Sequence, residues 1–337
     1  MANADVEVVV CGEVLCDLFA PRPGLLIADA DRLLPRLGGA PANVAVQTAR
    51  LGHQTALITA VGKDPFGARA LRALREESVL TNGVITMPDR RTGATLVEVD
   101  ADGERRFFGF REASADLALT PAHVDNNVSR RLLRRARVMH SGTVSLRTKG
   151  ARDATRFLQD HARGAGAIIS VDVNLRPGMY PSRDAMLERA YGAVATADVL
   201  KATLDEAKLL VRGRRMRSLA RQLLEQGPRL VMLTDGEGMM SATTMTRHVE
   251  LPALAAKTVD ATGAGDAFWG AVLSGLIMLD IDPMQVAHLD DGALLWLLDR
   301  GRRAGAAAVS ALGATTKMCR RLPMPRFLVD TRSAGAR

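Results

Sequence analysis

Short apolar runs alternate with longer amphipathic stretches along most of this chain, and the alternation restricts the folds that it can adopt. Each run has the length of a buried strand, and the stretches between the runs repeat apolar residues at helical spacing. Strands that alternate with helices build βαβ units, in which helices cover both faces of a parallel sheet. The sequence therefore predicts a doubly wound α/β fold. The expected strands span 6–12, 55–62, 137–142, 167–174, 198–202 and 229–236, and three of the expected helices span 41–52, 65–78 and 217–227.

Residues 95–110 interrupt this rhythm. They contain two strand-like runs around Asp102 and Gly103, and an Asp-Gly pair favours a tight hairpin turn. Together with residues 13–24, the hairpin is expected to form a small β-sheet that lies over one edge of the main domain as a lid. After residue 265 the pattern becomes mostly helical.

The length of 337 residues suits one large domain with a small appendage, because single cores stop growing near roughly 250–300 residues. We expect one domain over 1–320, with lid segments at about 13–37 and 90–116 inserted in it. Residues 321–337 are expected to form a C-terminal tail.

The formal net charge of +8 comes mainly from arginines that lie apart in the sequence, with no aromatic residues interleaved among them. This pattern predicts solvated helix faces and no nucleic-acid partner, while an anionic small substrate would suit the charge. No apolar stretch is as long as the ~18 residues of a membrane span, so we expect no membrane partner. The three cysteines have no metal-ligand spacing and no signal peptide is evident, so we expect a cytoplasmic protein.

The stretch VDATGAGDAFWGA, residues 259–271, places small residues directly before an expected helix. The N–H groups of Gly263, Ala264 and Gly265 would point outward as free donors beside the positive end of the helix dipole, which makes an anion site. Asp266 follows where a base for phosphoryl transfer is needed. The same carboxylate could simply cap the helix, and this alternative stays open.

A second glycine turn, LGGAPANVA at 37–45, also precedes an expected helix. Two such turns in one α/β chain predict two ligand groups that are held face to face. The chain has no G-x-x-x-x-G-K-[ST] loop, and its first strand leads to CGEVLCD, which lacks the G-x-G-x-x-G fingerprint of dinucleotide-binding proteins. A dehydrogenase is therefore disfavoured.

These two glycine regions resemble the two signatures of the PfkB sugar-kinase family, also called ribokinase-like. GGAPANVAVQTARLG at 38–52 is similar to the first and VDATGAGDAFWGAVLSG at 259–275 to the second, and the likeness extends over about 6–318. FGFREASADLAL at 108–119 and the D-x-N-x-R at 172–176 look most like those of fructokinases and 2-keto-3-deoxygluconate kinases.

The resemblance implies a ribokinase-like fold and transfer of the γ-phosphoryl group of ATP to a sugar hydroxymethyl. It implies that Asp266 is the general base and that the amides of Gly263, Ala264 and Gly265 stabilise the charge on the phosphoryl group. The sugar and ATP would be the ligands, and dimerisation through the lid is a family expectation that exposed hairpin edges favour.

The resemblance also assigns the sugar ligands. Asp17, Gly39 and Asn43 would bind sugar hydroxyls, because Asp accepts hydrogen bonds while Asn both donates and accepts them. Arg111 and Arg176 would face the sugar or an acidic substituent on it. Asn43 could instead be a helix cap, and either arginine could instead form a surface salt bridge.

The nucleotide would lie at Thr234, Gly236 and Gly238, unless that turn is merely structural. Glu206 matches the last position of the N-x-x-E element of the family, which holds Mg²⁺ mostly through water. This sequence departs from the element, because Thr203 stands where asparagine is usual, and direct metal contact there is in doubt. Asp260 and Thr262 occupy the positions at which many members bind a monovalent cation such as K⁺.

The function expected is therefore that of a sugar kinase, with fructose as the first choice of substrate. A kinase of 2-keto-3-deoxygluconate or another acidic sugar is an alternative, in which the arginines bind a carboxylate. A nucleoside kinase comes third, and a catalytically silent sugar-sensing protein is the alternative from another class.

Overall fold

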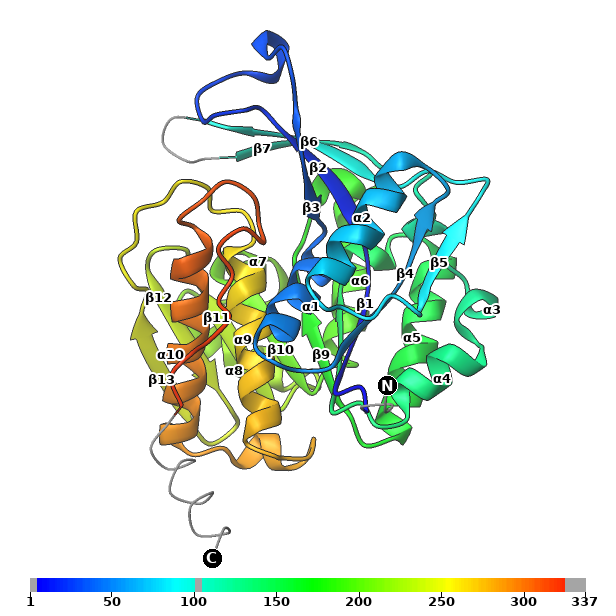
Figure 1. Ribbon diagram of the computed structural model, residues 1–337. Coiled ribbons are helices and arrows are strands. Elements are labelled where there is room, and N and C mark those ends of the chain that lie inside the picture. Colours follow the sequence, from blue (N-terminus) through cyan, green and yellow to red (C-terminus); the bar gives the residue numbers. More distant parts are fainter. Residues whose placement is uncertain (1–4, 101–104, 325–337) are drawn as a thin grey trace, which may run out of the picture.

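The computed structural model describes residues 5–100 and 105–324, and a nine-stranded sheet forms its centre. The strand order is β13-β12-β11-β10-β9-β8-β1-β4-β5 (Figure 1). The strands from β11 to β5 in this order run parallel, while β12 pairs antiparallel with both β11 and β13. The strands are β1 (Val8–Cys11), β4 (Thr55–Gly62), β5 (Val84–Met87), β8 (Val138–Gly142), β9 (Ile168–Asp172), β10 (Val199–Thr203), β11 (Leu230–Thr234), β12 (Met239–Thr243) and β13 (His248–Pro252).

Helices cover both faces of this sheet, as Figure 1 shows. One buried cluster joins the sheet to α1, α2, α9 and α10, and two others join its opposite face to α3–α5 and α6–α8. The doubly wound, mostly parallel α/β fold is thus confirmed. The helices are α1 (Ala40–Arg50), α2 (Pro65–Glu76), α3 (Pro121–Val124), α4 (Asn127–Leu133), α5 (Lys149–Gly164), α6 (Arg183–Val194), α7 (Leu204–Leu210), α8 (Met216–Leu224), α9 (Ala264–Met278) and α10 (Asp291–Ala308).

A separate four-stranded sheet projects beyond the main sheet as a lid, at the top of Figure 1. Its order is β3-β2-β6-β7, with β2 (Leu15–Phe19), β3 (Leu34–Gly38), β6 (Ala94–Val99) and β7 (Arg105–Phe110). β6 and β7 pair as an antiparallel hairpin, as the sequence predicts. The predicted turn residues Asp102 and Gly103 lie outside the described residues. The division into a domain over 1–320 and a tail over 321–337 stays a prediction.

The site-forming residues emerge where strands end. In an open α/β sheet, ligands bind beyond the carboxyl ends of the strands, at the point where the strand order reverses. Here β1 is that point, because the chain passes from β1 to β4 on one side and returns to β8 on the other. The lid strand β2 follows β1 directly, so the lid begins at this crevice. None of the helices within 5–100 and 105–324 is long and apolar enough to cross a membrane.

Candidate active site

Two glycines with positive φ angles begin the helices that flank the site. Gly39 is the N-cap of α1, with φ of 96°, and a Cβ there would lie 2.5 Å from the Glu13 carbonyl oxygen. Gly263 is the N-cap of α9, with φ of 79°, and a Cβ there would lie 2.6 Å from the Ala314 Cβ. Left-handed backbone and close approach both require glycine at these positions. Gly263, Ala264 and Gly265 therefore form the helix-opening turn that the sequence predicts, and we call it the anion turn.

Asn43 and Asp266 join the two glycine turns. The Asn43 Nδ2 donates a hydrogen bond of 2.8 Å to the Asp266 Oδ2, across 223 positions of sequence. Asn43 lies inside α1, whose cap is Gly39, so it is not a helix cap. Its Oδ1 is buried and has no hydrogen-bond partner among the described residues. Since a buried acceptor without a partner is costly, this oxygen is suited to accept a hydrogen bond from a ligand hydroxyl.

Asp266 is the third residue of α9 and is half-buried. Burial raises its pKa to about 6, although the hydrogen bond from Asn43 and the charge of Lys201 act in the opposite direction. A carboxylate with a raised pKa is a better proton acceptor than an ordinary aspartate. The geometry fits a base beside a bound hydroxyl.

Lys201 is a site residue that the sequence did not single out. Its Nζ donates to the Asp172 Oδ2 at 2.8 Å, and a Cβ on Gly265 would lie 3.0 Å from the same Nζ. Burial lowers the pKa of Lys201, but the carboxylates of Asp172 and Glu206 raise it above its ordinary value, so the ammonium is charged. A fixed positive charge therefore lies against the anion turn. The signal available in the sequence was a lysine within the otherwise apolar strand run DVLKA.

Asp17 lies in β2 of the lid, over the backbone of the first glycine turn. A Cβ on Gly38 would lie 2.2 Å from the Asp17 Oδ2, so only glycine leaves room for this carboxylate. Burial raises the pKa of Asp17 to about 7, although the charge of Arg111 lowers it. Among the described residues, only burial and neighbouring charges act on the Asp17 carboxyl group, and no hydrogen bond contributes to its pKa. The carboxyl group is thus buried and free to bind a ligand.

Arg111 belongs to a buried charge cluster under the lid rather than to a surface salt bridge. It is 6% exposed, and its Nη2 lies 2.5 Å from the Oδ2 of the buried Asp116. Glu13 is also buried and accepts a hydrogen bond of 3.0 Å from the Ser145 Oγ, and burial raises its pKa. Glu13 and Asp116 are site residues that no local sequence pattern indicates, because only the fold brings residues from three segments together.

Arg176 follows β9 in an exposed loop, and its Nη1 donates to the carbonyl oxygen of its neighbour Leu175 at 2.9 Å. Its positive charge lowers the pKa of Asp266, so it lies near enough to act on the base electrostatically. Nearby, Asn174 has a φ of 37°, which is a strained conformation for a residue other than glycine. The loop therefore places a cation at the rim of the site.

The predicted nucleotide turn connects β11 and β12. Thr234 ends β11, and Gly236 and Gly238 lie in the exposed turn after it. Gly236 has a φ of 52°, and the Gly238 N–H donates to the Asp235 carbonyl oxygen at 2.7 Å. β11 pairs in parallel with β10, the strand that contains Lys201. The turn therefore follows the carboxyl end of this strand pair.

Glu206 and Thr203 form a capping box at the start of α7. The two Glu206 oxygens accept backbone hydrogen bonds of 2.8 Å from Leu175 and Thr203, and the Thr203 Oγ1 accepts one from the Glu206 N–H. Each carboxylate oxygen retains a further lone pair, and Mg²⁺ in proteins usually keeps several waters. The residues fit a water-mediated contact from Glu206, while the Thr203 hydroxyl already serves as the helix cap.

Asp260 organises the chain before the anion turn. It is fully buried; its Oδ1 accepts from the N–H and the hydroxyl of Thr262, and its Oδ2 accepts from the Gly313 N–H at 2.8 Å. Within the described ranges, no cluster of three or more His, Cys, Asp or Glu residues has metal-binding geometry. A monovalent cation here would instead use carbonyl, hydroxyl and single carboxylate oxygens, which this loop does contain.

The sequence pattern of the pfkB family carbohydrate kinases matches residues 5–319. Fructokinase-2 of Zea mays is 36% identical over 267 residues, which cover 79% of this chain and 78% of the relative. The crystal structure of a fructokinase from Xylella fastidiosa with bound ATP has a TM-score of 0.82 at 28% identity and covers 98% of this chain and 99% of that one. A double mutant of a Vibrio cholerae O395 fructokinase, with fructose, ADP and potassium ion bound, has a TM-score of 0.81 at 26% identity, with coverage of 98% and 99%. These likenesses confirm the ribokinase-like fold.

Proposed function

Because this chain belongs to the pfkB family of carbohydrate kinases, we propose that it is a fructokinase, which transfers the γ-phosphoryl group of ATP to a hydroxymethyl group of fructose. The single observation that supports the chemistry best is the hydrogen bond between Asn43 and Asp266, beside the anion turn. It fixes a carboxylate of raised pKa in the first turn of α9, where helix N–H groups favour an anion, although the Ala264 N–H also donates to the Ala261 carbonyl oxygen at 3.3 Å.

Different residues have different roles in the proposed phosphoryl transfer. Such a reaction needs positioning and charge stabilisation more than covalent chemistry. We propose that Asp266 accepts the proton of the attacking hydroxyl and that Asn43 holds this carboxylate in place. The amides of Gly263, Ala264 and Gly265 and the ammonium of Lys201 would stabilise the negative charge on the phosphoryl group in flight.

The charge balance around the sugar residues favours a neutral substrate. Glu13, Asp17 and Asp116 place three buried carboxyl groups around the buried guanidinium of Arg111, which Asp116 already pairs. A substrate carboxylate would add a further negative charge to this cluster, and buried like charges repel strongly. Hydroxyl groups, in contrast, can donate hydrogen bonds to Asp17 and to the free Oδ1 of Asn43. A neutral ketose suits this site better than 2-keto-3-deoxygluconate.

ATP and Mg²⁺ are the cofactors that we propose, with K⁺ as a further ion. The exposed turn with Thr234, Gly236 and Gly238 would contact the nucleotide, and Glu206 would hold Mg²⁺ through water. When bound, Mg²⁺ neutralises charge on the β- and γ-phosphates. Asp260 and Thr262 would position the loop around a monovalent cation.

The cellular setting is a proposal of the same kind. The three cysteines have free thiols, which suits a reducing compartment, and we propose that the protein works in the cytoplasm. We further propose that 1–320 act as one kinase domain, with the lid segments closing over the sugar.

A panel of acceptors tests the function. Purified protein is incubated with MgATP and fructose, glucose, 2-keto-3-deoxygluconate or a nucleoside, and ADP release is measured. We expect fructose to give the highest kcat/KM. A clear preference for the keto acid or for the nucleoside would replace fructose as the substrate. If one sugar raised the melting temperature while no acceptor stimulated ADP release, the chain would be a sugar sensor.

A further inference from the structure

Residues 312–320, which we call the C-terminal strap, connect the anion turn to α1. At one end of the strap, the Gly313 N–H donates to Asp260. Ala314 packs closely on Gly263, since a Cβ added to Gly263 would lie 2.8 Å from the Ala314 carbonyl oxygen. The first residue of the anion turn thus rests directly on the strap. Any displacement of Ala314 would change the space in which the Gly263 backbone is held.

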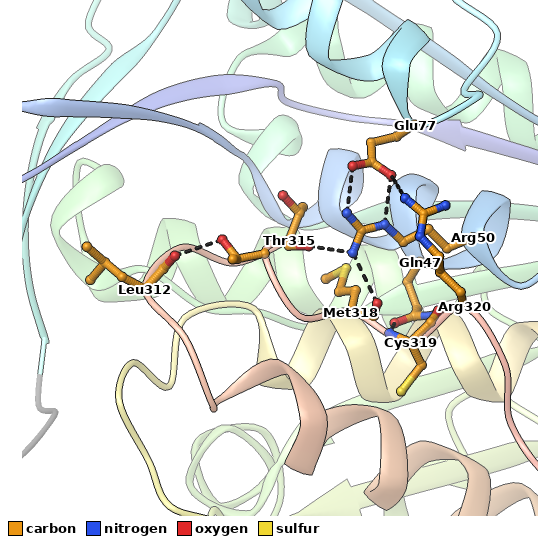
Figure 2. Close-up of polar contacts among 9 residues, drawn as sticks. Gln47, Arg50, Glu77, Leu312, Thr315, Met318, Cys319 and Arg320 are labelled. Atoms are coloured by element: carbon orange, nitrogen blue, oxygen red, sulfur yellow. Dashed lines mark hydrogen bonds and ion pairs between the residues drawn. The ribbon is translucent and has the colours of Figure 1, made fainter.

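At its other end the strap is fastened by two side chains of α1 (Figure 2). The Arg50 Nη1 donates to the carbonyl oxygens of Thr315, at 2.6 Å, and Met318, at 3.0 Å. The Gln47 amide makes two hydrogen bonds to the backbone of Cys319, one as donor at 2.9 Å and one as acceptor at 3.2 Å. These contacts bind backbone atoms, so they fix the path of the strap itself.

Glu77, just after α2, holds Arg50 in this position. Its two oxygens accept from the Arg50 Nε at 2.7 Å and Nη2 at 2.6 Å, in the planar two-point geometry that arginine and carboxylate favour. The Arg50 side chain is only 8% exposed. A buried guanidinium needs such a partner, because an unpaired buried charge is costly. The remaining contact of Glu77 is with Arg320, at 3.5 Å, whose side chain is 71% exposed.

Asn43, Gln47 and Arg50 are spaced by four and three residues, which places them on one face of α1. Asn43 contacts Asp266 on α9, while Gln47 and Arg50 contact the strap. Gln47 also packs on α9, since a Cβ on Gly270 would lie 2.8 Å from its Cβ. One rigid helix face is therefore in contact with the proposed base and with the segment that supports the anion turn.

We propose that Arg50, held by Glu77, is a positioning residue for phosphoryl transfer, which fastens the strap so that the anion turn keeps its orientation toward Asp266. The inference rests on the proposed kinase function and extends it to residues that touch neither sugar nor nucleotide. Because the anion turn acts mainly on the phosphoryl group in flight, a loosened strap should lower kcat more than it weakens sugar binding. Misplacement of catalytic groups by about 1 Å can cost on the order of 100-fold in rate.

Three variants test the proposal, each measured by kcat, by the KM for sugar and by hydrogen–deuterium exchange. Arg50→Lys keeps a positive charge but loses the two-point contact with Glu77 and one carbonyl contact. Glu77→Gln keeps the strap contacts of Arg50 but removes its charged partner. Arg320→Ala is the matched control. It also removes a cation beside Glu77, but the Arg320 side chain does not bind the backbone of the strap.

We expect Arg50→Lys to lower kcat by roughly 10- to 100-fold with the sugar KM within about twofold of its original value. Exchange should rise in peptides over 312–320 and over 259–266, while the rest of the chain keeps its protection. Glu77→Gln should show a smaller change in the same direction, and Arg320→Ala should resemble the unaltered protein.

The proposal is wrong if Arg50→Lys exchanges faster only over 312–320, because the anion turn would then be independent of the strap. It is also wrong if kcat and the sugar KM change together, or if only the melting temperature falls. If the unaltered protein phosphorylates no acceptor, the proposed function fails, but the exchange measurement still decides whether Arg50 orders the anion turn.

Discussion

Asp266 accepts a hydrogen bond from Asn43 and has a pKa raised by burial to about 6. Replacement by asparagine tests whether the ionisable carboxyl group is needed. Asp266→Asn keeps the shape of the side chain but cannot accept a proton from the sugar. We expect kcat to fall by about 100- to 10,000-fold, while the increase in melting temperature on adding fructose is retained. An Asp266→Asn protein with nearly unchanged kcat would contradict the role of base.

The raised pKa values of two carboxyl groups predict a pH dependence. Asp266 must be deprotonated to act as a base, so kcat should rise with pH through about 6 and then level off. Asp17, with a pKa raised by burial to about 7, accepts hydrogen bonds from sugar hydroxyls best when ionised, so the sugar KM should fall as pH rises through about 7. Steady-state kinetics from about pH 5 to about pH 8 would check the pH dependence of kcat and that of the sugar KM. A kcat that stays constant across this range would exclude Asp266 as the titrating base.

The raised pKa of Asp266 also predicts the direction in which the stability of the folded protein changes with pH. A carboxyl group that titrates at about 6 in the folded protein and near 3.8 when unfolded binds more protons in the folded state between these values. Stability from this group is therefore greatest at low pH and is lost as pH rises through that interval. At neutral pH, Asp266→Asn should accordingly melt at the same or a slightly higher temperature, so loss of activity cannot be ascribed to unfolding.

Lys201 offers a second test at a single position. Lys201→Met removes the charge beside Gly265, and we expect kcat to fall by about 100-fold or more. Because the variant leaves Asp172 buried without a partner, it should also be less stable. The double variant Lys201→Met, Asp172→Asn is the control: it should regain melting temperature but not kcat. Recovery of activity in the double variant would show that Lys201 only neutralises Asp172.

Among the elements, α9 depends on the left-handed residue at its start. Gly263→Ala would strain a backbone with φ of 79° and press its Cβ into Ala314. Gly166 has a similar φ of 85° but no atom within 4 Å of an added Cβ, so Gly166→Ala measures the backbone strain alone. We expect Gly166→Ala to lose roughly 1–2 kcal/mol of stability, Gly263→Ala to lose more because of the added contact with Ala314, and only Gly263→Ala to lose most of its kcat. Equal kcat in the two variants would mean that the packing of Ala314 on the anion turn is unimportant.

The secondary elements differ in how much of them the sequence reveals. β4 spans Thr55–Gly62, the predicted range, because all of its residues are buried and form one apolar run. β13 was missed, since His248–Pro252 is only half-buried and carries no such run. β5 was also missed, because its run is only four residues long and only its last residue is buried. Periodicity therefore finds the strands at the centre of the sheet and loses those toward its edges.

The residues of the candidate site also differ in how far the sequence reveals them, because some depend on local patterns and others on long-range packing. The turn at Gly263 and the position of Asp266 can be read locally, because one short segment contains both the glycines and the acid. The cluster of Glu13, Arg111 and Asp116 cannot, since the proximity of its members depends on how the lid packs. The fastening of the strap by Arg50 joins positions more than 260 residues apart, and no local pattern indicates it.

At the scale of the whole molecule, the lid ends in a strand that is exposed on both faces. β7 is the last strand of its sheet among the described residues, and Phe107, Phe108 and Phe110 are 47%, 47% and 61% exposed. Arg105 lies over the Phe107 ring. An exposed, apolar edge strand tends to pair with another chain unless it is covered. We therefore propose that two copies of this chain pair through their lids.

This pairing predicts a homodimer in solution whose stability depends on the aromatic edge. Light scattering after size-exclusion chromatography should give twice the mass of the chain, and Phe110→Lys should shift the mass toward that of a monomer, because a charge would be buried at the contact. Met239→Lys, a change of an exposed apolar residue on β12 of the main sheet, is the control and should leave the dimer intact. Since β7 is hydrogen-bonded to β6, and β6 to the strand that contains Asp17, loss of the dimer should also raise the sugar KM. A protein that is monomeric at all concentrations would contradict pairing of two copies through their lids.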